Sequence, residues 1–199
     1  MPLKRKTKRS LLLLGFFLLI LAAVIAAVYA YRKCEHEFRL SAHPLEYTEY
    51  VEASAEEFGL DSYLLYAVIK TESSFDPSAV SDVGARGLMQ IMEETFDWIQ
   101  FRLGEEGVTV YDDMFDPKLN IRYGAYLMSY LLEKFGDVRE AAAAYHSGAG
   151  CVSEWLSDKA YSSDGKRLDT IPSDSAEHYV NKIENAYRNY RELYAEEQR

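Results

Sequence analysis

The sequence is poor in features that point to several common classes of protein. Only Cys34 and Cys151 are cysteines among the 199 residues, so at most one disulfide is possible, and we expect two free thiols. The four histidines lack the spacing of metal ligands, and we expect no metal and no cofactor. No stretch alternates regularly between apolar and polar residues, and no internal repeat is present. These absences argue against disulfide scaffolds, zinc modules and β-sheet proteins.

Basic residues are scarce after the first nine positions. Five of the 22 Lys and Arg residues lie there, and the rest of the chain holds 17 basic against 32 acidic residues. A formal charge of −15 on that part repels nucleic acids and the anionic surface of a membrane. We therefore expect no nucleic-acid partner, whereas a carbohydrate substrate remains compatible with the charge.

One long hydrophobic run is present, from Leu11 to Tyr31, with no charge over 21 positions. A helix of this length spans ~30 Å, the thickness of the hydrocarbon core of a bilayer. The larger basic cluster precedes the run, and such clusters stay in the cytoplasm. We expect a cytoplasmic tail (1–10), a transmembrane anchor (11–31) that crosses the cell membrane once, and an extracytoplasmic remainder.

A cleavable signal peptide is the alternative to this anchor. Its apolar region is normally about 7–15 residues, shorter than this run, although Val-Tyr-Ala before Tyr31 would serve as a cleavage site. The length favours an uncleaved anchor. Lipidation at Cys34 is disfavoured, because bulky or charged residues precede it: Tyr31, Arg32 and Lys33.

Helix caps and helix breakers divide the rest of the chain. A short polar linker (32–43) leads into a domain (44–199) in which Asp61, Asp116 and Asp137 stand where N-caps are expected, with Pro117 after the second. The expected helices cover 44–58, 62–73, 93–103, 117–135, 138–146, 151–157 and 175–195. A domain of about 155 residues is large enough for one core, and we place Leu88, Ile91 and Trp98 in it.

One of these helices carries a glutamate among apolar residues. Glu72 shares a face with four apolar positions at spacings of three and four: Leu65, Val68, Ile69 and Phe75. By itself, a partly exposed glutamate with its stem on the core is the commoner explanation. Burial and a helix C-terminus both raise a carboxyl pKa, however, and an acid with a raised pKa can protonate a glycosidic oxygen near neutral pH.

Three stretches in order resemble the lytic transglycosylases of the SLT type, which cleave the glycan strands of peptidoglycan. They are ESSFDPSAVSDVGARGLMQIM (72–92), AYHSGAG (144–150) and IPSDSAEHYVNKI (171–183), and the resemblance extends from about 47 to 194. It implies an all-α fold, a lysozyme-like helical domain, with peptidoglycan as the partner. This domain would follow the single N-terminal transmembrane helix expected from the hydrophobic run.

The resemblance also implies a mechanism with one carboxyl group. Glu72 would protonate the β-1,4 bond between N-acetylmuramic acid and N-acetylglucosamine. As a carboxylate it would then accept the proton of the muramoyl 6-hydroxyl, which closes onto C1 as a 1,6-anhydro sugar without water. We expect structural roles for the neighbouring Asp76 and Asp82, so that no second carboxylate activates water.

By the same resemblance, eight residues would contact the glycan: Ser73, Ser81, Gly87, Gln90, Met92, Tyr145, His146 and Tyr179. Tyr145 would either orient Glu72 through its hydroxyl or face the reacting ring. His146 departs from the family pattern Ala-Tyr-Asn-x-Gly, in which asparagine holds this position. A glutamate that contacts the stem peptide in some relatives would fall near Ser175.

Two other functions remain open. A hydrolytic muramidase of the goose-lysozyme type shares the architecture and would give reducing ends in place of anhydro ends. A non-catalytic wall-binding module would retain the cleft without turnover. His146 is the sequence feature that favours this alternative.

Overall fold

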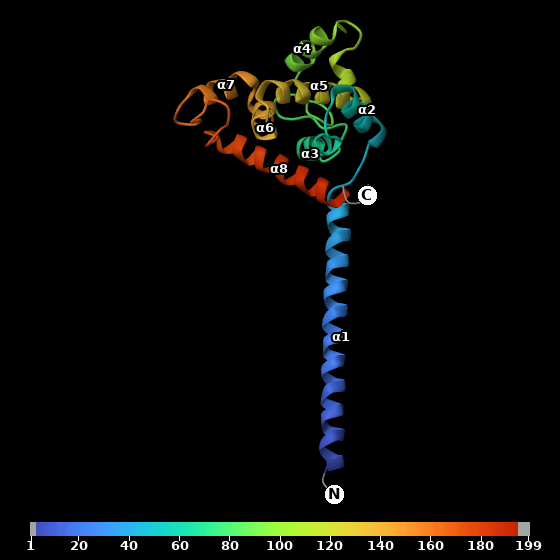
Figure 1. Ribbon diagram of the computed structural model, residues 1–199. Coiled ribbons are helices and arrows are strands. Elements are labelled where there is room, and N and C mark those ends of the chain that lie inside the picture. The colour runs from blue at the N-terminus through green and yellow to red at the C-terminus, as the bar shows by residue number, and fades with distance from the viewer. Residues whose placement is uncertain (1–2, 195–199) are drawn as a thin grey trace. The chain divides into compact units, whose positions relative to one another are not determined.

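The computed structural model describes residues 3–194 (Figure 1). The chain forms two compact units, and the boundary between them in the sequence lies between Pro44 and Leu45. The first unit is α1, Leu3–Ala42. The helix continues through the expected linker as far as Ala42, because no glycine or proline occurs between Gly15 and Pro44.

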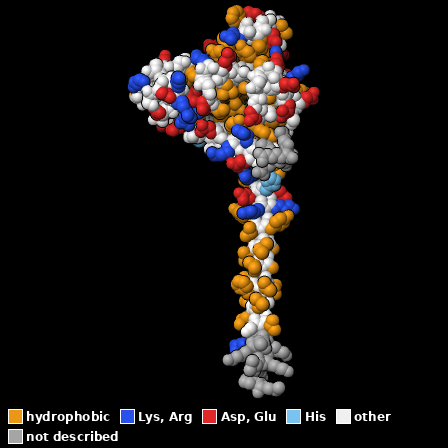
Figure 2. Space-filling model, in the orientation of Figure 1, with side chains coloured by type: hydrophobic (Ala, Val, Ile, Leu, Met, Phe, Trp, Pro, Cys, Tyr) orange, Lys and Arg blue, Asp and Glu red, His pale blue; other side chains and the backbone are white. Residues whose placement is uncertain are grey.

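The middle of α1 is apolar on all sides. Its large hydrophobic side chains from Leu11 to Val28 are exposed, and Figure 2 shows them around the helix. Among the described residues, α1 is the one helix long and apolar enough to cross a membrane. A helix without a polar face suits a lipid environment better than a protein surface.

The second unit is helical. Its elements are α2 (Thr48–Phe58), α3 (Ser62–Ser73), α4 (Glu93–Leu103), the 3₁₀ helix η1 (Tyr111–Phe115), α5 (Pro117–Phe135), α6 (Val138–Ser147), α7 (Ala149–Ser157) and α8 (Asp174–Tyr194). Between residues 3 and 194 there is no strand, and the β-type pairing consists of isolated bridges at Arg86. The predicted all-α fold is confirmed.

Several boundaries differ from the prediction. The first helix of this unit starts at Thr48 rather than Pro44, because Tyr47 adopts a left-handed conformation with φ of 57°. α7 starts two residues early, directly after Gly148, whose φ of 86° makes the turn possible. The 3₁₀ helix η1 was not predicted. The predicted end of the last helix, Ala195, lies outside the described residues.

The predicted N-caps are confirmed. The side chains of Asp61, Asp116 and Asp137 each accept a hydrogen bond from a backbone N–H in the first turn of the helix that follows. Both cysteines are free, as expected.

The core is built around α3. Residues Leu64 to Ile69 are all buried, so this helix is enclosed on every side rather than on one face. α8 and α2 pack against it, and Figure 1 shows α8 running beneath α3 and α6. The predicted core positions Leu88 and Ile91 are buried too. Enclosure of α3 leaves its C-terminal end, which carries Glu72, at the edge of the core.

The loop between α3 and α4 is tied to α5 by Asn120. This buried side chain accepts a hydrogen bond from Met89 N at 2.7 Å and donates to the carbonyl oxygens of Arg86 and Met114, both at 2.9 Å. Gly87 lies against this contact with a φ of 75°, and a Cβ atom there would overlap Met114 O and the Asn120 amide. The backbone therefore approaches Asn120 this closely only with glycine at 87.

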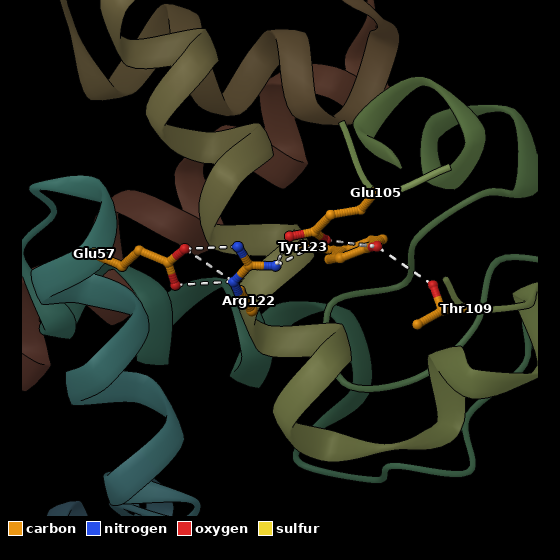
Figure 3. Close-up of polar contacts among 5 residues, drawn as sticks. All are labelled: Glu57, Glu105, Thr109, Arg122 and Tyr123. Atoms are coloured by element: carbon orange, nitrogen blue, oxygen red, sulfur yellow. Dashed lines mark hydrogen bonds and ion pairs between the residues drawn. The ribbon is translucent and has the colours of Figure 1, made fainter. Parts of the chain in front are cut away.

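Arg122 of α5 joins two further parts of the unit (Figure 3). Its guanidinium donates to both carboxylate oxygens of Glu57 on α2, at 2.7 and 2.9 Å, and to both oxygens of Glu105 after α4, at 3.0 Å. Tyr123 also donates to Glu105, at 3.3 Å. Bidentate pairs of this kind fix geometry, so the segment after α4 is held against α2 and α5.

Gly87→Ala is expected to destabilise the protein by about 3 kcal/mol, the combined cost of a left-handed alanine and of overpacking. Gly84→Ala is the matched control. Its φ is 89°, but no atom lies within 4 Å of the added Cβ, so we expect a loss of about 1 kcal/mol from strain alone. Urea unfolding of the full chain in detergent, followed by circular dichroism, measures both. Equal losses would contradict the close approach described for Gly87.

Candidate active site

Glu72 lies in the last turn of α3, half-buried at the edge of the core. Burial raises the pKa of its carboxyl group from the ordinary 4.5 to about 7, because a charge is poorly solvated there. Tyr179 of α8 donates its hydroxyl to Glu72 Oε1 at 2.6 Å, which favours the charged form and acts in the opposite direction. Burial outweighs the hydrogen bond, and both forms of the carboxyl are populated near pH 7.

The turn after Glu72 has an unusual backbone. Ser74 and Phe75 both have positive φ, 52° and 68°, although neither is glycine. Such conformations cost about 1–2 kcal/mol per residue, and burial of Phe75 against Tyr66 offsets part of this cost. Phe75 thus shares the buried face predicted for it, but it lies beyond the end of the helix. The sharp turn ends α3 directly after the acid.

Tyr145 of α6 does not bind Glu72. Its hydroxyl donates to the carbonyl oxygen of Met89 at 2.7 Å. The hydrogen bond to the acid, which we considered for Tyr145, is made by Tyr179 instead. Tyr145 still lies close enough for the charge of Glu72 to raise its pKa, together with burial.

Tyr179 is itself held by a residue of α6. The imidazole of His146 stacks on the Tyr179 ring with centroids 4.8 Å apart and planes 22° apart. The other contact of His146 is Nε2 to Ser175 Oγ, at 3.0 Å. His146 is exposed, but partial desolvation of its ring by the residues packed on it lowers its pKa below the usual 6.5, so the neutral form predominates at pH 7.

Three residues of the predicted site, Ser73, Ser81 and Gln90, support the loop between α3 and α4 with their side chains. Ser73 Oγ donates to Leu88 O at 2.8 Å, and Ser81 Oγ accepts from Ala85 N at 3.0 Å. The Gln90 amide donates to Gly87 O at 2.8 Å and to Ala79 O at 3.1 Å. In this structure these polar groups stabilise the loop, and their contacts with a sugar stay a prediction. Met92, by contrast, is exposed at the start of α4.

Two cavities open beside α4. One, of about 380 Å³, is lined by Trp98 of α4 and Tyr145 of α6, and also by Glu94, Thr95, Leu127, Tyr130, Leu131, Ala144, Gly148 and Ala149. The other, also of about 380 Å³, is lined by Met92 and Tyr111, with Val83, Gly84, Arg86, Glu93 and Glu94. Glu94 borders both, so they adjoin at the first turn of α4.

The first cavity has walls suited to a sugar ring. Trp98 and Tyr130 meet edge to face with centroids 4.9 Å apart and present aromatic surface. Trp98 packs against the core, as predicted, but it is only partly buried and also lines this cavity. Spacing in the sequence did not indicate that Trp98, Tyr130 and Glu94 would line one space, because they lie on two helices brought together by packing. Within the described part of the chain, no three His, Cys, Asp or Glu side chains are grouped as metal ligands.

The family model described as "Transglycosylase SLT domain" matches residues 49–168. Among curated proteins, the transglycosylase of Enterobacteria phage PRD1 is 37% identical over 117 residues, which cover 59% of this chain and 40% of the phage protein. The membrane-bound lytic murein transglycosylase C of Edwardsiella ictaluri is 31% identical over 169 residues, which cover 74% of this chain and 47% of that protein. The chain thus spans less than half the length of these relatives.

Solved structures give the same assignment. The 70 kDa soluble lytic transglycosylase of Escherichia coli matches with a TM-score of 0.70 and 28% identity, over 78% of this chain and 25% of that one. An inactive mutant of the lytic transglycosylase Slt of Pseudomonas aeruginosa matches with a TM-score of 0.67 and 30% identity, over 76% of this chain and 25% of that one. The predicted lysozyme-like SLT fold is therefore confirmed, and by its matched segment, its motifs and its helical architecture the chain belongs to the transglycosylase SLT domain family.

Proposed function

We propose that this protein is a peptidoglycan lytic transglycosylase that cleaves the β-1,4 bond between N-acetylmuramic acid and N-acetylglucosamine without water. The observation that carries the proposal is the half-buried carboxyl of Glu72, with a pKa raised to about 7 and Tyr179 as its hydrogen-bond partner. A group with this pKa serves as an acid and as a base at neutral pH.

The first step uses the protonated form of Glu72. Its proton goes to the glycosidic oxygen as the bond from that oxygen to C1 of the muramoyl residue breaks, and positive charge develops at C1. Glu72 is then a carboxylate, and the hydroxyl of Tyr179 stabilises the new charge.

The second step uses the carboxylate. Glu72 takes the proton of the muramoyl 6-hydroxyl while that oxygen bonds to C1, which gives the 1,6-anhydro sugar and restores the acid. The two steps together consume no water, because one bond to C1 breaks, another forms, and the proton returns to Glu72.

The surroundings of Glu72 support a mechanism with one carboxylate. In the described residues, no second carboxylate contributes to its pKa shift. Asp76 accepts hydrogen bonds from the backbone N–H and the hydroxyl of Ser78, and the Ser78 hydroxyl lowers its pKa. Asp82 is exposed on the loop. Glycosidases that use water or a covalent intermediate hold two carboxyl groups across the bond, so this arrangement favours the intramolecular route over a muramidase.

The adjoining cavities along α4 offer the space for a glycan strand. Aromatic surface from Trp98 and Tyr130 suits the apolar faces of sugar rings. Tyr145 lines the same cavity and lies close enough to Glu72 for that charge to raise its pKa. A solved complex of a 70 kDa soluble lytic transglycosylase with bulgecin A matches this chain with a TM-score of 0.69 and 26% identity.

We further propose that α1 crosses the cell membrane once and that the second unit lies on the extracytoplasmic side, where peptidoglycan is found. The exposed apolar surface of α1 and the basic cluster before it in the sequence support this orientation. The name of the Edwardsiella relative, a membrane-bound enzyme, agrees with membrane association.

Product analysis tests the reaction. The full chain in detergent, incubated with purified peptidoglycan, should release fragments with 1,6-anhydro-muramoyl ends detected by mass spectrometry. Glu72→Gln cannot deliver or accept the proton and should lower the rate about a thousand-fold or more. Reducing ends in the wild-type digest would support a muramidase, and binding without release would support a wall-binding module.

The control for this variant is Asp82→Asn, which removes a carboxylate from the same loop region at an exposed position. We expect close to wild-type rates. A similar loss in both variants would point to the net charge of the region rather than to proton transfer by Glu72.

The raised pKa of Glu72 has a consequence for stability. Below about pH 4.5 the side chain is neutral in both the folded and unfolded states, and as the pH rises through about 7 the folded state must bury a charge. Glu72→Gln removes that cost, so its advantage in unfolding free energy over the wild type should grow between pH 5 and pH 8. Allowing for partial exposure, we expect about 1–2 kcal/mol.

Thermal unfolding of both full-length proteins in detergent at pH 5 and pH 8 measures this difference. The substitution Asp82→Asn should show no such trend. A difference between wild type and Glu72→Gln that does not change with pH would mean that Glu72 is well solvated.

A further inference from the structure

Two positions that depart from the family pattern meet in the structure. By the resemblance described above, His146 stands where the family motif would have asparagine, and Ser175 falls near the place of a glutamate in some relatives. His146 Nε2 and Ser175 Oγ are 3.0 Å apart, on α6 and α8. Neither group contacts Glu72 directly, but the histidine ring stacks on Tyr179, which does.

We propose that His146, held by Ser175, is a positioning residue that keeps the hydroxyl of Tyr179 on Glu72. The inference rests on the proposed function only for its effect on turnover, because the contact between Tyr179 and Glu72 exists without substrate. The chain of contacts runs from Ser175 to His146, from His146 to the face of Tyr179, and from Tyr179 to the acid.

Ring stacking opposes the one kind of Tyr179 motion that would break its hydrogen bond to Glu72. The hydroxyl lies on the long axis of the ring, so spinning the ring about that axis leaves the oxygen in place, whereas a sideways swing carries it away from Glu72. The flat face of His146 at 4.8 Å opposes a swing toward α6. The hydrogen bond to Ser175 in turn restricts the imidazole, whose own position is exposed.

Few titratable groups lie near the stacked rings of His146 and Tyr179. Tyr145 and His146 face it from α6, Glu72 from α3 and Tyr179 from α8. Asp174 and Glu177 flank Ser175 in the first turn of α8, but both are exposed. His146 is neutral near pH 7, so it acts on Tyr179 as a flat ring and not as a charge.

The pKa of Glu72 reports directly on the contact. It can be measured in the full chain in detergent from the pH dependence of the carboxyl carbon signal of labelled glutamate, with Glu72→Gln identifying the signal. Tyr179→Phe removes the hydrogen bond to the charged form, so the pKa of Glu72 should rise by about one unit. His146→Ala should raise it in the same direction by a smaller amount.

A double-mutant cycle decides whether His146 acts through Tyr179. If it does, adding His146→Ala to Tyr179→Phe should move the pKa no further than Tyr179→Phe alone. His146→Phe keeps a flat ring and should restore most of the wild-type value, while Ser175→Ala should give a small shift toward the alanine value. An unchanged pKa in His146→Ala, or fully additive shifts, would overturn the proposal.

Turnover gives an independent measurement. With soluble glycan strands, His146→Ala should lower kcat about ten-fold or more, in line with the cost of a misplaced reacting group, and leave KM nearly unchanged. A raised KM with an unchanged pKa of Glu72 would instead make His146 a simple sugar contact. If the wild type forms no anhydro product, the proposed function fails, but the pKa cycle still tests the positioning role. Should His146→Ala fail to fold, Ser175→Ala and His146→Phe carry the same comparison.

Discussion

The hydrogen bond between Tyr179 and Glu72 is the interaction on which the rest of the site depends. A carboxyl at the edge of an apolar core, without a partner, would have a still higher pKa and would be a poorer base at neutral pH. A fully hydrated carboxyl would be ionised and would be a poor acid. Burial on α3 and a single phenolic donor from α8 act in opposite directions and leave a pKa of about 7. In the mechanism we propose, this one residue performs both proton transfers.

The loop between α3 and α4 is held rigidly by hydrogen bonds, which helps to keep the surroundings of Glu72 fixed. Polar side chains that our sequence analysis assigned to the substrate, Ser81 and Gln90, bind the loop's own backbone, and Asn120 binds it from α5. Arg122 holds the segment after α4 in the same way, from the other side of α5. A cleft wall made of satisfied backbone groups keeps its shape before substrate arrives, which lowers the entropy lost on binding.

The sequence predicted the helices of the second unit well, because aspartate caps, Pro117 and terminal glycines act within one turn of the chain. The half-buried position of Glu72 was also visible in the sequence, because an exception to an apolar face shows at spacings of three and four, while its catalytic role stays a proposal. Partners far along the chain were not predictable in this way. The sequence around Tyr145, which binds Met89, does not distinguish it from Tyr179, which binds the acid. In the same way, the sequence around Asn120 is that of an ordinary helix residue. Such assignments depend on which helices pack together, which only the structure supplies.

Glu72 and its donor are 107 residues apart in the chain, and α8 is the last helix described. During synthesis, α3 emerges long before α8 and has no phenol to bind until the final helix docks. A chain that is interrupted, or clipped by a protease before Tyr179, carries the acid without the group that tunes it. Under the proposed function, the proton-transfer group would therefore acquire its tuning partner only after the chain from α3 to α8 has been made and folded.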